Sequence, residues 1–168
     1  MRLATPSDYP AVSRLIQDNF ANDPRYARLS EQARAAYLES NSLQGLTEAC
    51  SHPDNVLCLV ATTETTGAIL GFAMYRRGTH LLTGESVVEG KRVQIASAMQ
   101  AKGLGALLLG VAGQQLLAQG FTKGVGYVSS DSVAFFERQG RRSLRVLDNP
   151  ALAKLGVKAE ATYMEWDL

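Results

Sequence analysis

The sequence predicts an α/β fold in which helices pack on a mixed β-sheet. Runs of apolar and β-branched residues over 56–62 and 68–76 are typical of strands, whereas residues 104–117 carry apolar side chains at helical spacing. Because strand-like and helical segments alternate along the chain, the expected order is βααβββαβαββ. The chain has 168 residues, of which 46% are hydrophobic, which is enough for one core, so residues 1–168 are expected to form a single domain.

Two helices are expected in the first fifty residues. Ser7 or Asp8 can begin the first helix, because each side chain can accept a hydrogen bond from a free backbone amide. The apolar side of that helix follows at helical spacing as Val12, Leu15, Ile16 and Phe20. A second helix is expected from Ser30 into the forties, with the exit marked by Gly45 and by residues 51–54.

A hairpin and a second turn are expected in the middle of the chain. Residues 64–67 have the composition of a turn and join the first two strand-like runs. The next turn is expected at 83–86, because Gly78 and Gly90 stand symmetrically about Gly84, as paired bulges or kinks in two facing strands would. A further strand therefore follows this turn.

The remaining elements alternate between helix and strand. In order they are a helix over 104–117 ending at Gly120, a strand over 124–128, a helix over 133–136 ending at Gly140, and strands over 144–147 and 162–166. Asp131 or Ser132 can cap the second of these helices.

Charge and composition exclude several functions. The 17 Lys and Arg residues nearly balance the 16 Asp and Glu residues, so a net charge of +1 provides no overall attraction for nucleic acid or an anionic membrane. No apolar run approaches the roughly 20 residues of a membrane span, and the N-terminus lacks a secretory apolar segment, so a cytoplasmic location is expected. Cys50 and Cys58 are too few for a disulfide framework, and Cys58 is expected to be a buried free thiol. His52 and His80 have no metal-binding spacing, so no metal is expected.

The segment over 93–108 runs from a strand through a glycine-rich loop into a helix. Free amides at a helix start bind phosphate oxygens, and glycines let the backbone approach a ligand closely. The dinucleotide pattern Gly-x-Gly-x-x-Gly fails because Leu108 stands at its last position, and the Gly-Lys-Ser/Thr of a phosphate loop is absent. Two or three such amides could still anchor a pyrophosphate.

The run Gln100-Ala101-Lys102-Gly103-Leu104-Gly105 resembles the acyl-CoA loop of the GNAT superfamily of N-acetyltransferases, whose pattern is Gln/Arg-x-x-Gly-x-Gly/Ala. Residues 4–8, the central hairpin and residues 132–140 extend the resemblance over nearly the whole chain. It implies a mostly antiparallel sheet of six to seven strands with about four helices, splayed between the fourth and fifth strands. It also implies acetyl-CoA as the acyl donor, an amine as the acceptor, no metal, and compatibility with a homodimer.

The resemblance assigns residues to coenzyme A. Backbone amides from Lys102 to Gly105 would hold the pyrophosphate, Gln100 would shape the loop, and Ile95 and Ser97, at the end of the fourth strand, would offer backbone groups to the pantetheine arm. The full set is Ile95, Ser97, Gln100, Ala101, Lys102, Gly103, Leu104, Gly105, Ala106, Ser129, Phe135, Phe136 and Arg138. Tyr127 and Ser129 would form the other wall, Phe135 and Phe136 would lie against the tail, and Arg138, with Arg141 and Arg142, could meet the 3′-phosphate.

Transfer to an amine needs a base, because an amine of pKa ~10.4 is protonated at pH 7. Glu89 is the first candidate, since counting back from the loop puts it at the start of the fourth strand, where some family members carry a catalytic glutamate. His80 is a second candidate by pKa, and Glu85 is expected at a hairpin tip.

The chain departs from the family pattern where a tyrosine usually protonates the leaving thiolate. Phe136 stands there and cannot donate a proton, and Ser129 replaces the usual asparagine. Four explanations are open. Tyr127 or another hydroxyl could protonate the thiolate in place of the tyrosine, or solvent could protonate it. The acyl group could also go to an acceptor that needs no acid, or catalysis could be lost. The alternative function is therefore a catalytically silent CoA-binding module that senses or interacts.

The acceptor site in this family is usually built from the first two helices and a late loop. In this chain those segments are 20–42 and 148–158, where Tyr26, Tyr37 and Asn41 are candidate contacts. The mixed charges of these segments do not identify an acceptor.

Overall fold

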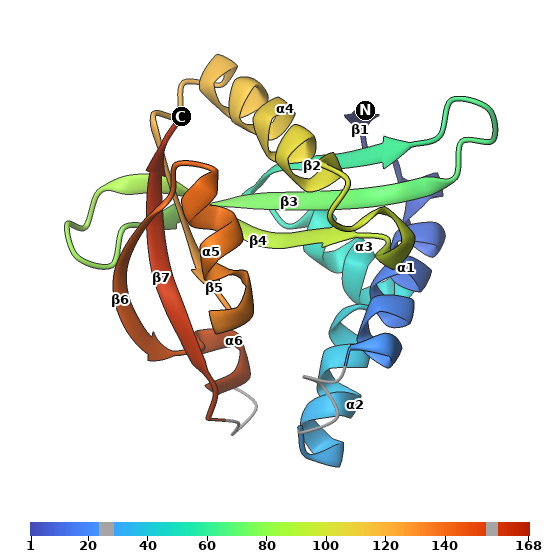
Figure 1. The fold of residues 1–168 in the computed structure, drawn as a ribbon, viewed down its shortest axis with the longest axis horizontal. Coiled ribbons are helices and arrows are strands. Elements are labelled where there is room, and N and C mark those ends of the chain that lie inside the picture. The colour runs from blue at the N-terminus through green and yellow to red at the C-terminus, as the bar shows by residue number, and fades with distance from the viewer. Residues whose placement is uncertain (24–28, 154–157) are drawn as a thin grey trace.

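The computed structural model describes residues 1–23, 29–153 and 158–168. Within these ranges the strands form one seven-stranded sheet in the order β1-β2-β3-β4-β5-β7-β6 (Figure 1). The strands are β1 (Arg2–Leu3), β2 (Asn55–Thr62), β3 (Ile69–Thr79), β4 (Ser86–Ile95), β5 (Lys123–Val128), β6 (Arg142–Asp148) and β7 (Glu160–Asp167). Neighbours pair antiparallel except β4 and β5, which are parallel. The predicted mixed, mostly antiparallel sheet is confirmed.

Helices cover both faces of this sheet (Figure 1). They are α1 (Tyr9–Asn22), α2 (Glu31–Ser40), α3 (Leu43–Ser51), α4 (Leu104–Ala118), α5 (Ser130–Arg138) and α6 (Pro150–Ala153), with short 3-10 turns η1 (Pro6–Asp8) and η3 (Ser97–Met99). Helices α1 and α3 pack on one face of β2 and β3, and α4 packs on the opposite face.

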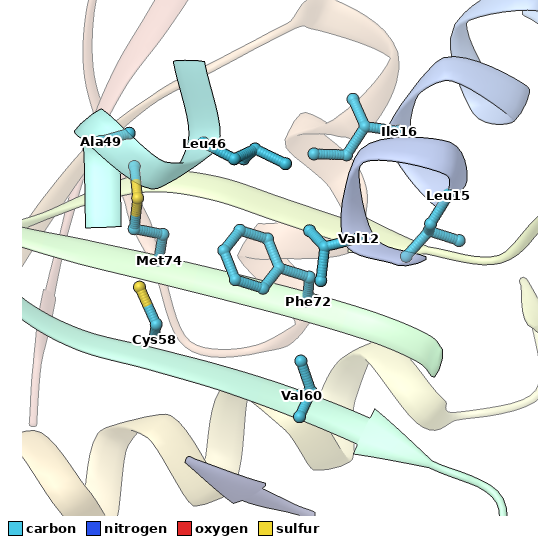
Figure 2. Packing of buried hydrophobic residues seen from close by; sticks show 9 residues of the cluster. All are labelled: Val12, Leu15, Ile16, Leu46, Ala49, Cys58, Val60, Phe72 and Met74. Atoms are coloured by element: carbon cyan, nitrogen blue, oxygen red, sulfur yellow. The ribbon is translucent and has the colours of Figure 1, made fainter. Parts of the chain in front are cut away.

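The core between α1, α3 and the sheet includes Val12, Leu15 and Ile16, which stand at the predicted helical spacing. Figure 2 shows its members, which are Val12, Leu15, Ile16, Leu46, Ala49, Cys58, Val60, Phe72 and Met74. Each is at most 9% exposed. Burying a side chain of Val, Leu or Phe size contributes roughly 1.5–3 kcal/mol, so this layer holds the N-terminal helices in place.

Strands β4 and β5 separate toward their C-terminal ends. They pair only at Val88↔Gly124, Glu89↔Val125 and Gly90↔Gly126, although both strands continue. Directly after Gly90, Lys91 is an extra residue in β4, because Tyr75 of β3 faces Gly90 and Met74 faces Arg92. A bulge bends its strand and increases the local twist, so it favours the separation. The predicted splay between the fourth and fifth strands is confirmed.

The single second helix of the sequence interpretation is wrong, because the chain forms α2 and α3 with a break at Asn41. Ser42 caps α3 by accepting a hydrogen bond from the Gly45 amide at 3.1 Å. Gly45 lies inside α3 and does not end a helix. A Cβ atom there would lie 2.6 Å from the Glu39 carbonyl oxygen, so the close contact with the end of α2 requires glycine.

Three smaller expectations also need correction. Gly84 lies in the predicted turn at φ +75°, but the paired bulges are absent from the described strands, because Gly78 pairs regularly with Val87 and the extra residue is Lys91. Strand β4 ends at Ile95, so Ser97 lies in η3 and not in the strand. Helix α5 begins at Ser130 with Ser129 as its N-cap, so Asp131 and Ser132, the predicted caps, lie inside its first turn.

Candidate functional site

Two helix N-termini lie where β4 and β5 have separated. Strand β4 ends at Ile95 and leads through η3 into α4, and β5 ends at Val128 and leads directly into α5. In open α/β sheets, ligands bind beyond the carboxyl ends of parallel strands, where helix starts offer free amides. This pair of strand ends is therefore the candidate binding site.

The loop before α4 has an unusual backbone. Gly103, the residue preceding α4, has φ +82°, and Ala101 has φ +59°, a conformation that residues with a side chain rarely adopt. No side chain among the described residues caps α4. The Leu107 amide donates a hydrogen bond to the Gly103 carbonyl oxygen at 3.1 Å, which is the first backbone hydrogen bond of the helix. The amides of the first turn therefore remain available to an anionic group.

The end of β4 is fixed by two side-chain amides. The Ile95 carbonyl oxygen accepts hydrogen bonds from Asn19 Nδ2 at 3.0 Å and from Gln100 Nε2 at 3.2 Å. The Gln100 contact links the loop to the end of β4. Asn19 was missed by the sequence analysis, although it is a polar residue on the apolar side of α1 beside Ile16 and Phe20, which is a visible signal.

Helices α4 and α5 approach closely at the loop. A Cβ atom on Gly105 would lie 3.2 Å from Phe135 Cζ and 3.7 Å from Ile95 Cγ1. Phe135 and Phe136 contact each other edge to face at 5.1 Å between ring centroids. Phe136 also faces the Arg141 guanidinium at 4.8 Å. The structure thus brings Ile95, Gly105 and Phe135 together, and it turns Phe136 toward Arg141.

Glu89 and Tyr127 lie on the face of the sheet opposite α4 and α5. Glu89 pairs with Val125, and side chains two residues apart in a strand share a face, so Tyr127 lies on the same side as Glu89. Tyr127 also pairs with Tyr163 of β7, at 5.2 Å between ring centroids. Burial, and then the Glu89 charge, raise the pKa of Tyr127, so this hydroxyl keeps its proton at neutral pH. Glu89 is 19% exposed and pairs with Lys91 Nζ at 2.7 Å.

His80 and Glu85 are engaged in the hairpin between β3 and β4. His80 is 2% exposed, its Nδ1 accepts the amides of Leu82 and Thr83 at 3.2 Å each, and its Nε2 lies 3.0 Å from Glu165 Oε2. Because both ring nitrogens have partners, His80 stabilises the turn and is excluded as the base. Glu85 accepts a hydrogen bond from Thr83 Oγ1 at 2.9 Å, near the expected hairpin tip.

The three arginines expected near a phosphate occupy different environments. Arg138 is exposed in the last turn of α5, whereas Arg142 pairs with Glu165. Arg141 is only 8% exposed and lies over the Trp166 ring at 4.1 Å, and its burial lowers its pKa. Arg141 is therefore the buried member of the three, with Nε and Nη1 unpartnered among the described residues, and its contact with the 3′-phosphate stays a prediction. A pocket of about 320 Å³ beside it lies mainly along the middle of α4.

The candidate acceptor residues on α2 have structural partners. Asn41 is 3% exposed, and its Oδ1 accepts a hydrogen bond from Arg92 Nε at 2.9 Å. Tyr37 stacks on Phe20 at 4.7 Å between ring centroids. Buried Asn41 thus joins α2 to β4 and is removed as a substrate contact. Tyr26 lies outside the described residues.

Metal-binding clusters and membrane-spanning helices are both absent from the described part of the chain. In these ranges, no group of three or more His, Cys, Asp or Glu side chains is arranged to hold a metal ion. None of the described helices is both long and apolar enough to cross a membrane.

Comparisons with known proteins agree with this geometry. The model of the Acetyltransferase (GNAT) family matches residues 16–140. No curated protein gives a significant match. Among solved structures, PaiA N-acetyltransferase from Thermoplasma acidophilum in complex with coenzyme A is 17% identical, with TM-score 0.70 and coverage of 99% of this chain and 97% of that chain.

Two further structures have the same fold. Ribosomal-protein-alanine N-acetyltransferase from Brucella melitensis is 22% identical, with TM-score 0.66 and coverage of 99% of this chain and 98% of that chain. YncA from Salmonella typhimurium, a structure solved with its cofactor acetyl-CoA, is 20% identical, with TM-score 0.65 and coverage of 99% of this chain and 92% of that chain.

Proposed function

The chain belongs to the acetyltransferase (GNAT) family, and from this premise we propose that residues 1–168 form one N-acetyltransferase domain. It transfers an acetyl group from acetyl-CoA to a primary amine of a small molecule, an amino acid or a protein. The observation that carries the proposal is the separation of β4 and β5 after Gly90 and Gly126. Helix N-termini lie at these strand ends, and Glu89 and Tyr127 lie on the other face of the sheet.

The residues at the loop fit the phosphates of coenzyme A. Among the described residues, no side chain caps the first turn of α4. Gly103, at φ +82°, turns the backbone from the loop into this helix. The amides from Lys102 to Gly105 bind the pyrophosphate, each charge-assisted contact contributing roughly 1.5–3 kcal/mol. Gly105 lets the Phe135 ring pack against the first turn of α4, because a Cβ atom there would lie 3.2 Å from Phe135 Cζ.

In the proposed mechanism, acetyl-CoA supplies an activated thioester carbonyl. Glu89 accepts a proton from the ammonium form of the acceptor, directly or through water, because only the neutral amine has a free electron pair. The amine nitrogen then attacks the carbonyl carbon. As the tetrahedral adduct collapses, the carbon–sulfur bond breaks and the nitrogen loses its second proton, which solvent returns to the acid that protonates the thiolate. Tyr127, whose raised pKa keeps its hydroxyl protonated, donates the proton that the departing thiolate takes up.

A second candidate function is binding of CoA without catalysis. The specific observation in its favour is Phe136, which has no hydroxyl and faces Arg141 at 4.8 Å. A thiolate of pKa ~8.5 is a tolerable leaving group even without an acid, so transfer remains the first proposal.

Calorimetric titration with acetyl-CoA tests the binding step. The wild-type chain should bind one molecule per chain, more weakly when the 3′-phosphate is removed. Gly103→Glu should abolish binding, because a carboxylate at the helix start repels the pyrophosphate. Gly84→Glu is the matched control. Gly84 also has a positive φ of +75°, and a Cβ atom there would meet no other atom within 4 Å. Unlike Gly103, Gly84 belongs to the hairpin turn.

Thiol release from acetyl-CoA with a panel of amines tests the transfer step. Release that depends on an added amine supports the acetyltransferase. Binding without release from any amine supports the silent module. Failure of the wild-type chain to bind millimolar acetyl-CoA contradicts both.

A further inference from the structure

Two cysteine sulfur atoms lie in contact on the side of the sheet covered by α1 and α3. Cys50 lies near the end of α3 and Cys58 lies in β2, and their Sγ atoms are 3.3 Å apart. Both are free thiols. A disulfide bond is about 2.05 Å long, so the two sulfurs need to approach each other by only about 1 Å more.

The surrounding groups make the two thiols unequal. The thiol of Cys58 donates to Cys50 Sγ, and this hydrogen bond, helped by Tyr9 and the charges of Arg92 and Arg76, lowers the pKa of Cys50 to about 7 against the effect of burial. The same contact, together with burial, raises the pKa of Cys58. A thiolate is the reactive form of cysteine, so Cys50 is the nucleophile of the pair.

Access and local structure also favour reaction at this pair. Cys50 is half-buried, whereas Cys58 is 9% exposed, so a small oxidant reaches Cys50 first. Asn55 joins the two segments, because its Nδ2 lies 3.0 Å from the Cys50 carbonyl oxygen and 3.4 Å from Cys58 Sγ. The second sulfur is therefore already beside the first when the first reacts.

We propose that Cys50 and Cys58 form a reversible intramolecular disulfide when the chain meets hydrogen peroxide. The Cys50 thiolate attacks one peroxide oxygen, the O–O bond breaks, and the hydroxide released is protonated to water. Cys58 then attacks the sulfur of the Cys50 sulfenic acid, the S–S bond forms, and a second water leaves with the thiol proton. The two thiols lose two electrons and the peroxide gains them. A dithiol reductant reverses the reaction by exchange.

This modification would tie α3 to β2 beside two arginines that hold α2 and α3 to the sheet. Arg76 Nη2 donates to the Ala49 carbonyl at 2.9 Å, and Arg92 Nη2 donates to the Ser40 carbonyl at 3.0 Å. These arginines join the ends of α2 and α3 to β3 and β4. Disulfide formation does not require acetyl transfer, because it changes only the two sulfur atoms.

The test treats the native full-length chain with a small excess of hydrogen peroxide, then blocks free thiols and measures the intact mass. We expect loss of two hydrogens per chain, no blocked cysteine, and a peptide that joins residues 50 and 58. Dithiothreitol should restore two free thiols. Two thiols that remain free after peroxide, or a disulfide that joins two chains, would overturn the proposal.

Two variants separate the roles of the cysteines. Cys58→Ser should accumulate a Cys50 sulfenic acid that dimedone traps, because the second sulfur is missing. Cys50→Ser should react with peroxide at least tenfold more slowly than the wild-type chain. Equal rates for Cys50→Ser and wild type would contradict the assignment of Cys50 as the nucleophile. The wild-type mass measurement decides the proposal even if either variant folds poorly.

Discussion

The indole ring of Trp166 occupies the space that a side chain on Gly124 would need. A Cβ atom at Gly124 would lie 2.3 Å from Trp166 Cε2. The same ring lies 3.6 Å from the positions that Cβ atoms of Gly90 and Gly126 would take. Trp166 therefore packs directly on the last paired residues of β4 and β5, at the point where the strands begin to separate.

Gly124→Ala should destabilise the fold, because the methyl group collides with a large ring held among strands. We expect a loss of about 1–3 kcal/mol in the free energy of unfolding, measured by denaturant titration. Gly110→Ala is the control, because Gly110 lies on the exposed side of α4 and an added Cβ atom there would meet no other atom within 4 Å. That change should stabilise by about 0.5–1 kcal/mol. Equal stability of the two variants would contradict the packing.

Glu89→Gln should lower turnover at neutral pH while leaving acetyl-CoA affinity nearly unchanged. The amide keeps the size of the side chain but cannot accept the ammonium proton, and general bases contribute about 10²–10⁴-fold. Steady-state kinetics and calorimetry on the same preparation measure the two effects. Glu85→Gln in the hairpin should retain wild-type turnover. Turnover of Glu89→Gln that matches wild type across the pH range removes Glu89 as the base.

Tyr127→Phe should reduce kcat and change its pH dependence. The pKa of Tyr127 is raised from its usual value, mainly by burial, so the hydroxyl remains a proton donor through neutral and mildly alkaline pH. The wild-type enzyme should lose activity only as this group deprotonates in strongly alkaline solution, and the variant should lack that decline. We expect about a tenfold or larger loss of kcat at pH 7. A variant that keeps the alkaline decline shows that another group is the acid.

Asp8→Asn should remove an acid-sensitive part of the stability. The Asp8 carboxylate accepts hydrogen bonds from Arg2 at 2.7 Å and from the Thr5 amide at 2.8 Å, which hold its pKa well below the usual value. An unfolded aspartate titrates near pH ~3.9, so the contribution is present above that pH and is lost as pH falls toward the lower folded pKa. Because Arg2 is half-exposed, we expect about 1 kcal/mol at pH 7.

The comparison for Asp8 is denaturant titration at pH 7 and near pH 2. Wild type should lose more stability than Asp8→Asn on acidification, since only wild type has this carboxylate to protonate. Parallel losses in the two proteins would show that the ion pair with Arg2 contributes nothing to the acid response.

Local signals in the sequence were sufficient for the fold class and for the loop. The helical spacing of Val12, Leu15 and Ile16 predicted α1. One side of a surface helix must be apolar to face the core, and this holds without knowledge of where the core lies. The run from Gln100 to Gly105 predicted a glycine-rich helix start, because its backbone conformation is set within a few residues. Because these features depend on residues that are neighbours in the chain, they can be predicted from the sequence without knowledge of the fold.

Contacts between distant segments were decided only by the tertiary structure. The register of β4 with β5 places Glu89 and Tyr127 on one face. The close approach of the end of α2 to α3 requires glycine at position 45. The burial of Arg141 and the contact of Cys50 with Cys58 likewise follow from packing. Spacing along the chain does not contain this information, because strand register and helix docking are set by the whole core at once.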